Sequence, residues 1–341
     1  FMLSRVVVSL ARRSKSSMRG AIVPSFGGPE NIVVKDDLPT PSITSSNQVL
    51  IDVHTAGVNP VDTYIRSGTY ARLPDLPYVP GRDGCGVVRE VGSDVRHVKA
   101  GDRVWFIDPP TGATAEVTVA TKVFPLPDGL SFIEGSGLGI PYLTAHRALF
   151  TCGHLKKSDR VLIHGASGGV GLAACQLARF FGASLVVGTA GTKEGQDTVA
   201  RNGAHHTVCH RDDKYVDNLR KIAPYGFDMI IEMLANVNLA TDLDLLAHGG
   251  RVGIVGNRGE ITINPRALMQ KESSAYGVML NAASPSDLSS CSDILLSLFS
   301  STEYRPVHNR VYSLDEFPQS HRDIIDPSLP AIGNRVILIR K

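Results

Sequence analysis

A glycine-rich turn between a short apolar run and a run of small residues constrains this chain more than any other feature. Val161–His164 reads as a buried strand, the sequence GASGGVG follows as a tight turn, and residues 170–181 read as a helix. In the pattern A-x-G-x-x-G, Ala166 opens the turn, Gly168 lets a pyrophosphate approach the backbone, and Gly171 lets the helix pack on the strand. The start of the helix then offers free N–H groups to phosphates, so the turn predicts dinucleotide binding.

The residues after the turn continue the alternation of strands and helices. Strands are expected at 184–187, 229–232 and 251–255, helices at 195–202 and 238–246, and a last or edge strand around 277–280. Gly249 and Gly250 are expected to close the helix before the next strand. Such alternation predicts a Rossmann domain with a doubly wound parallel sheet over residues 141–281.

The first part of the chain has a different pattern. Residues 18–140 are rich in Gly and Pro and contain alternating segments such as 49–54 and 86–92, which predict a compact, mostly β domain. The strong strand pattern at 334–339 is expected to return to this domain, because the Rossmann sheet is already filled. The fold class is therefore α/β, with 18–140 and 282–341 as one domain and 141–281 as the other.

Composition excludes several classes of protein. Apolar residues at 43% and charged residues at 20% are ordinary globular usage. A net charge of +2 gives little support to a nucleic-acid partner, and no apolar stretch reaches the roughly 20 residues of a membrane helix. Five scattered cysteines without a C-x-x-C pair suit a reducing compartment.

The first 17 residues form a basic segment. MLSRVVVSLARRSKSS, from Met2, contains Arg5, Arg12, Arg13 and Lys15 and no acid. This is the composition of a mitochondrial transit peptide, which predicts a mitochondrial location. The alternative is a disordered basic arm on a cytoplasmic protein, with Met18 as another start.

The end of the second Rossmann strand indicates which nicotinamide cofactor binds. An NAD site usually has an acid there to hold the ribose 2′-hydroxyl, whereas this chain has VGTAGTK up to Lys193. Lys193, His210 and Arg211 favour a 2′-phosphate, although Glu194 is a contrary signal. NADPH is therefore the expected cofactor.

With these features the chain resembles the zeta-crystallin-type NADPH:quinone oxidoreductases of the medium-chain dehydrogenase/reductase superfamily. The resemblance runs from Met18 to the C-terminus, and its marks are GVNPVDTYIRSGTY at 57–70, GASGGVGLAACQ at 165–176, GTAGTKEGQ at 188–196, IIEMLANVNL at 230–239 and HGGRVGIVGNRG at 248–259. It implies a GroES-like catalytic domain, a Rossmann cofactor domain, and a homo-oligomer joined through the Rossmann domains.

The resemblance also implies site residues. The family's cofactor contacts match Ser167, Gly168, Gly169 and Val170 at the pyrophosphate turn, Gly191, Lys193 and His210 at the adenosine end, Asn238 in the ANVN segment, and Val255, Gly256, Asn257, Arg258, Val278, Met279 and Leu280 beside the nicotinamide. Tyr64 matches the tyrosine of the cofactor and substrate pocket, and Asn59 and Tyr70 match its neighbours.

Two segments depart from the family pattern. Gly333-Asn334-Arg335 stands where a Gly-Lys-aliphatic sequence is expected, and Arg335 is expected to supply the missing cofactor-binding charge one place along. Asp108-Pro109-Pro110 replaces a turn of small residues and changes one wall of the pocket.

The ligands of a catalytic zinc are not expected here. The zinc-dependent alcohol dehydrogenases of the same superfamily use a Cys and a His-Glu pair, and the matching positions hold Asn59, Arg82 and Asp83. Arg cannot ligate a cation, and the four-cysteine lobe of a structural zinc site is missing from the sequence.

Without zinc, the chemistry suits acceptors that are already electrophilic. Quinones are the first expectation, with Tyr64 and Asn59 orienting the acceptor and steadying its developing negative charge. Two alternatives stay open: an NADPH-dependent 2-enoyl thioester reductase, and a non-enzymatic NADPH-binding structural or RNA-binding protein.

Overall fold

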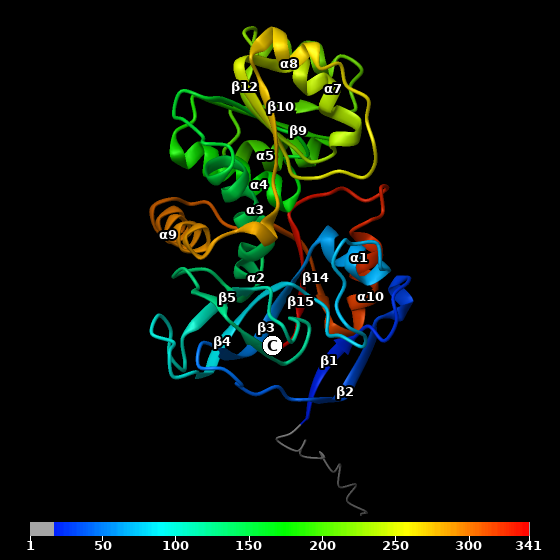
Figure 1. Ribbon diagram of the computed structural model, residues 1–341, viewed down its shortest axis with the longest axis vertical. Coiled ribbons are helices and arrows are strands. Elements are labelled where there is room, and N and C mark those ends of the chain that lie inside the picture. Colours follow the sequence, from blue (N-terminus) through cyan, green and yellow to red (C-terminus); the bar gives the residue numbers. More distant parts are fainter. Residues whose placement is uncertain (1–16, 341) are drawn as a thin grey trace, which may run out of the picture.

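The computed structural model describes residues 17–340, which form two domains placed end to end (Figure 1). The predicted transit peptide lies outside the described residues, apart from Ser17. Within 17–340, no helix combines the length and apolar character needed to cross a membrane.

The catalytic domain is built on a mostly antiparallel sheet of seven strands. Its order is β14-β15-β3-β4-β5-β7, and β6 pairs with β3. The strands are β3 (Val49–Val58), β4 (Asp83–Val91), β5 (Arg103–Ile107), β6 (Val117–Ala120), β7 (Lys122–Pro125), β14 (His308–Ser313) and β15 (Asn334–Leu338). The hairpin β1 (Ser17–Ile22) and β2 (Val33–Pro39), the turn η1 (Pro29–Asn31), α1 (Pro60–Ser67), η5 (Leu314–Glu316) and α10 (Phe317–Asp323) complete the domain. Because β15 pairs with β3, the end of the chain completes this sheet.

The second domain is a parallel six-stranded sheet in the order β10-β9-β8-β11-β12-β13. The strands are β8 (Arg160–Ile163), β9 (Leu185–Ala190), β10 (His206–Cys209), β11 (Phe227–Glu232), β12 (Leu246–Ile254) and β13 (Ser274–Gly277). The helices are α4 (Gly169–Phe181), α5 (Lys193–Arg201), α6 (Tyr215–Ile222), α7 (Ala235–Leu245) and α8 (Arg266–Lys271). Strand order reverses between β8 and β11, so the expected doubly wound Rossmann fold is confirmed.

Two expected details of this sheet are wrong. Gly249 and Gly250 lie inside β12 rather than at the end of a helix, because α7 ends at Leu245 and the strand begins at once. The pairing of β11 with β12 contains a bulge: Phe227 and Met229, two residues apart, pair with Leu246 and Arg251, which are five residues apart. Gly249, with φ of 71°, makes the bend that this bulge requires. The edge strand β13 ends at Gly277, before most of the expected run 277–280, and η4 (Leu280–Ala282) follows.

Helices at the junction join the two domains into one core. They are α2 (Phe132–Gly135), the π-helical turns η2 (Leu138–Tyr142) and η3 (Arg147–Thr151), α3 (Leu143–His146) between them, and α9 (Pro285–Ser301). Tyr142 and Phe299 pack edge to face with ring centres 5.6 Å apart. Residues of α9 share one hydrophobic cluster with Trp105 of the catalytic sheet and Leu172 of α4. The two sheets are therefore held by buried apolar contacts as well as by the chain connections.

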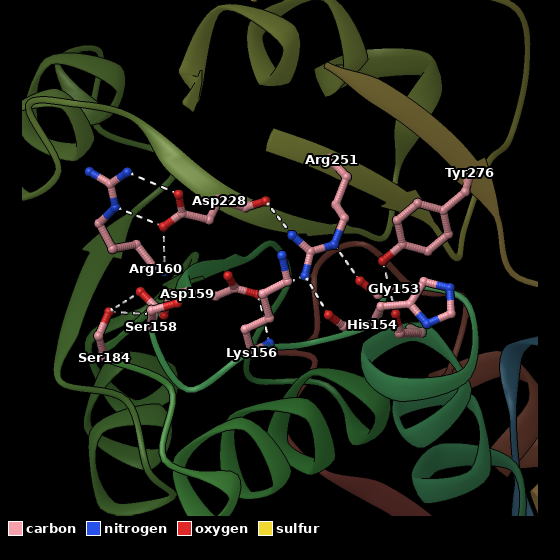
Figure 2. A network of polar contacts seen from close by, with 11 residues as sticks. Gly153, His154, Lys156, Ser158, Asp159, Arg160, Ser184, Asp228, Arg251 and Tyr276 are labelled. Atoms are coloured by element: carbon pink, nitrogen blue, oxygen red, sulfur yellow. Dashed lines mark hydrogen bonds and ion pairs between the residues drawn. The ribbon is translucent and has the colours of Figure 1, made fainter. Parts of the chain in front are cut away.

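Ionic contacts fix the amino-terminal ends of the Rossmann strands (Figure 2). Arg160 Nε and Nη2 donate to the two carboxylate oxygens of Asp228 at 2.8 and 3.0 Å. Arg251 donates to Asp159 Oδ2 at 2.6 Å and to the backbone carbonyl of His154 at 3.1 Å. These contacts hold β8, β11 and β12 together at their amino-terminal ends, opposite the end of the sheet that carries the glycine turn, where ligands bind in such folds.

Candidate active site

The glycine turn joins β8 to α4 as the sequence predicts. Gly165 has φ of 55° and Gly168 is the extended residue before the first helical turn. A Cβ added at Gly171 would lie 2.5 Å from both Ala166 Cα and Gly165 O, so only glycine lets the helix start this close to the strand. The turn therefore has the backbone of a dinucleotide site.

The space above Gly168 is open. A Cβ added there would meet only Gly165 O, at 3.5 Å, so packing within the described chain does not require glycine. The first N–H groups of α4 have no acceptor within the helix and carry its positive dipole end. Ser167 is buried and Val170 half-buried around this opening. The residues present thus fit a pyrophosphate.

The C-terminal segment crosses onto the same turn. Gly333 N donates to Ser167 O at 2.7 Å, and a Cβ on Gly169 would collide with Asn334 Oδ1. Arg335, expected at the cofactor, is buried instead, and its Nη2 donates to Asp323 O at 2.9 Å. Since side chains alternate along β15, Asn334 faces the glycine turn while Arg335 faces the catalytic domain.

Basic side chains gather at the expected adenosine end. A Cβ on Gly191 would lie 2.8 Å from His210 Nε2 and 2.9 Å from Arg211 Nε, so both side chains pack on this glycine. Lys193 begins α5 with its side chain 84% exposed and pairs with Asp197 at 2.7 Å. Three basic residues therefore surround the point where a 2′-phosphate is expected.

A buried polar cluster lies beneath the turn, at the reversal of strand order. His164 Nε2 is 2.9 Å from Asp242 Oδ1 and 3.8 Å from Glu232 Oε2, and all three side chains are buried. Glu232 Oε1 accepts the N–H of Leu234 and, at 3.2 Å, Nδ2 of Asn238. Glu232 thus fixes the orientation of the asparagine that is expected to contact the cofactor.

The residues expected beside the nicotinamide follow β12 and β13. Val255 and Gly256 donate their N–H groups to Glu232 O at 2.9 and 3.2 Å, and Val278 donates to Ile254 O at 2.9 Å. Asn257 and Arg258 are exposed, Leu280 is half-buried and Met279 is 57% exposed. These segments therefore leave the sheet at the same edge as the glycine turn.

The catalytic candidates lie on α1 or directly next to it in the chain. Asn59 precedes the helix, is buried, and donates from Nδ2 to Asp83 Oδ1 at 2.8 Å. Tyr64 is half-buried on α1, and its hydroxyl forms no hydrogen bond with another described residue. Tyr70 is half-buried in the segment after α1, close to Arg82. Tyr64 is thus free to bind another molecule, whereas Asn59 is fixed in place.

The zinc-ligand positions hold a hydrogen-bonded network. Asp83 accepts from Ile140 N at 2.7 Å with Oδ2, and burial, with the nearby charge of Asp62, raises the pKa of Asp83 to about 7. Burial also raises the pKa of Asp62, which accepts from Asn59 N at 2.8 Å, to about 6. Asn59 and Asp83 satisfy each other, and the alcohol dehydrogenase ligand set is not reproduced.

A cleft of about 500 Å³ opens next to this network. It is lined by α1, by the segments 72–74, 78–82 and 108–112, by Lys122 and by Asn281 from η4. Asn281 follows directly after the segment 278–280, so the cleft lies at the domain junction beside the expected nicotinamide site.

Sequence reasoning missed two groups of residues in the site. His164 and Glu232 are ionisable residues at the ends of apolar strands. That position in the sequence could have indicated the buried cluster that they form with Asp242. The set Arg82, Asp108 and Lys122 meets in the cleft from three separate segments, which spacing along the chain cannot indicate.

Comparisons with known proteins agree with this architecture. Residues 45–131 match the alcohol dehydrogenase GroES-like domain, and 169–297 match the zinc-binding dehydrogenase family. A human protein named quinone oxidoreductase is 47% identical over 325 residues, covering 94% of this chain and 98% of its own. The pig protein of the same name is 49% identical over 317 residues, covering 92% and 95%.

A solved structure gives the same result for the fold. Escherichia coli quinone oxidoreductase, complexed with NADPH, superposes with a TM-score of 0.82 at 28% identity, over 94% of this chain and 99% of its own. The fold, the turn and the relatives agree along almost the whole chain. This chain therefore belongs to the quinone oxidoreductase family of the medium-chain dehydrogenase/reductase superfamily.

Proposed function

We propose that this protein is an NADPH-dependent quinone oxidoreductase that works without zinc. The observation that carries the proposal is the glycine turn with its open Gly168, together with the basic side chains packed on Gly191. The human and pig relatives are named quinone oxidoreductases, and the Escherichia coli relative is complexed with NADPH.

The chain's own residues divide the work. Gly168, Gly169 and the start of α4 hold the pyrophosphate, while Lys193, His210 and Arg211 bind the 2′-phosphate. Asn238, fixed by Glu232, and the segments 255–258 and 278–280 hold the nicotinamide end. The bound NADPH supplies the hydride.

The acceptor is oriented from the catalytic domain. Tyr64 donates a hydrogen bond to a quinone oxygen, and Asn59, held by Asp83, supports the same wall of the site. A quinone needs no Lewis acid to become electrophilic, so positioned donors are sufficient. The 2-enoyl thioester and RNA-binding alternatives gain no support from the named relatives.

The experiment is a substrate panel. We expect NADPH oxidation with small ortho- and para-quinones and little with 2-enoyl thioesters or with NADH. Oxidation with the thioesters alone would replace the proposed function by the reductase alternative, and no oxidation with either would leave a binding role.

We further propose a homo-oligomer joined through the Rossmann domains. Strand β13 is the edge of the six-stranded sheet, and Ser274, Ala275 and Gly277 on it are exposed. Light scattering would measure the molecular mass of the assembly. Ala275→Pro should shift that mass toward the monomer, because proline has no N–H to pair with a strand of a second subunit.

A mitochondrial location is proposed from the basic segment at residues 1–17. The support is its composition, four basic residues and no acid. Fusion of this segment to a fluorescent reporter should direct the reporter to mitochondria, and a diffuse reporter would favour the cytoplasm.

A further inference from the structure

The cleft at the domain junction carries charges that the proposed function does not use. Its lining includes the cations Arg72, Arg82 and Lys122 and the carboxyl groups of Asp62 and Asp108. Even with both carboxyl groups ionised, they balance only two of the three cations. The lining is therefore net positive.

Arg82 and Asp108 form a preorganised pair on one wall. Arg82 Nε donates to Asp108 Oδ1 at 2.8 Å, and Asp108 N donates to Arg82 O at 2.6 Å. Asp108 has φ of 50°, in the left-handed region that Asp adopts more readily than most residues other than Gly. The prolines at 109 and 110 follow directly.

Asp108 is shared between two cations. Its Oδ2 lies 3.2 Å from Lys122 Nζ, so one carboxylate neutralises only one of the two positive groups. Arg82 Nη2 also donates to Asn281 Oδ1, which brings the guanidinium across the cleft toward η4. Its Nη1 forms no hydrogen bond with a described residue. The remaining donors of Arg82 and Lys122 therefore border the 500 Å³ cleft beside the expected nicotinamide site.

We propose that Arg82 and Lys122 select hydride acceptors that carry an anionic substituent, a carboxylate or a sulfonate. This inference rests on the proposed function and adds the substrate class to it. Nη1 of Arg82 and the ammonium group of Lys122 can each donate to such an anion, and a cationic cleft raises the local concentration of an anion. An ion pair with a purely structural role would make no distinction between charged and neutral acceptors.

The test compares 1,2-naphthoquinone with 1,2-naphthoquinone-4-sulfonate. The measured quantity is the ratio of kcat/KM for the sulfonate to kcat/KM for the neutral quinone, which cancels general damage to the enzyme. Lys122→Gln and Arg82→Gln should each lower this ratio by about three- to tenfold, as expected for a partly screened charge-assisted contact. Raising the salt concentration should lower it in the unmodified protein.

Two matched variants complete the design. Asp108→Asn should raise the ratio, because it removes the competing carboxylate while Asn still tolerates positive φ. Lys35→Gln, which removes an exposed charge on β2 that is not part of the cleft lining, should leave the ratio unchanged. Opposite signs at Lys122 and Asp108 are the signature of a charge effect.

Binding of unreactive probes gives a readout apart from turnover. Naphthalene-2-sulfonate should bind more tightly than naphthalene-2-sulfonamide by calorimetry, and Lys122→Gln should reduce the difference. If neither quinone is reduced but the sulfonate preference is present, the proposed function fails and the anion site stands. If neutral quinone is reduced while the ratio and the probe affinities are the same in all variants, the anion site is overturned.

Discussion

His164 Nε2 lies 2.9 Å from Asp242 Oδ1 beneath the glycine turn, and both side chains are buried. Burial alone would lower the pKa of His164, but the hydrogen bond to Asp242 and the charges of Asp242 and Glu232 raise it above its ordinary value. Burial, together with Asp242, raises the pKa of Glu232 to about 7. The hydrogen bond to Asp242 therefore favours the protonated imidazole of His164, while burial favours the protonated form of Glu232.

Glu232→Gln should change how stability depends on pH. Because the folded-state pKa of Glu232 is raised, its proton is retained in the folded chain and lost from the unfolded chain between its ordinary pKa of about 4.3 and about 7. Over that window the free energy of unfolding should fall with rising pH by about 1.4 kcal/mol per pH unit from this group. The raised pKa of His164 adds a further fall that begins at the ordinary histidine pKa of about 6.5. The glutamine variant should lack the Glu232 contribution.

Urea unfolding of both proteins across this pH range would measure the difference. The stability of the variant should rise relative to that of the unmodified protein as the pH rises. The slope from His164 should become smaller, because the charge of Glu232 no longer raises the pKa of His164. Parallel stability curves would mean that Glu232 ionises in the folded protein as an exposed carboxyl does.

Lys193→Glu should weaken NADPH selectively. Lys193 is exposed at the start of α5, beside Gly191 and its packed His210 and Arg211. Loss of one charge-assisted phosphate contact should raise the Kd for NADPH about tenfold or more, with little change for NADH. Lys221→Glu makes the same charge change on α6 and should have little effect. Equal affinities for the two cofactors in the unmodified protein would contradict the assignment of the 2′-phosphate site.

Chelators should leave the activity intact. Asn59 donates to Asp83, and Arg82 stands where a ligand is needed, so catalytic zinc has no ligand set at the acceptor. Dialysis against EDTA or 1,10-phenanthroline should change neither quinone turnover nor the melting temperature. Elemental analysis that finds one zinc per chain would contradict the metal-free mechanism and direct attention to His164, Glu232 and Asp242, whose ligand atoms lie within 4.8 Å of one another.

The sequence indicated the parts of the fold that depend on local backbone chemistry. The close approach of Gly171 to Ala166 follows from a pattern of glycines, and the helix 170–181 is found one residue longer, as α4. Strands β8, β9, β11 and β12 and helices α5 and α7 could be predicted for the same reason, since each carries its own periodicity, whereas α6 and α8 were not predicted. No clear helical pattern indicated α9, whose apolar residues lie in the core that the two domains share.

Contacts between distant segments could not be predicted. The burial of Arg335 depends on Asp323 O and on the register of β15 against β3, neither of which spacing reveals. The bend at Gly249 depends on a bulge opposite β11. The pair of Arg82 and Asp108 likewise joins two loops that only the folded sheet brings together. In the sequence, Asp108 stands out as a departure from the family, and Arg82 stands out because it occupies a ligand position of the zinc-dependent enzymes.

Tyr64→Phe should reduce quinone turnover several-fold without loss of the fold, because a single neutral hydrogen bond contributes about 0.5–1.5 kcal/mol. Tyr64 is half-buried on α1, and its hydroxyl has no partner among the described residues, so its removal leaves no buried group unsatisfied. Tyr64→Ala should reduce turnover further, since it also opens a void beside the cofactor and loosens the alignment of the acceptor.

Tyr225→Ala, at a residue 84% exposed, is the matched control. Quinone reduction and NADPH affinity would be measured together for all three variants, and unchanged kinetics in Tyr64→Ala would place the acceptor elsewhere in the cleft.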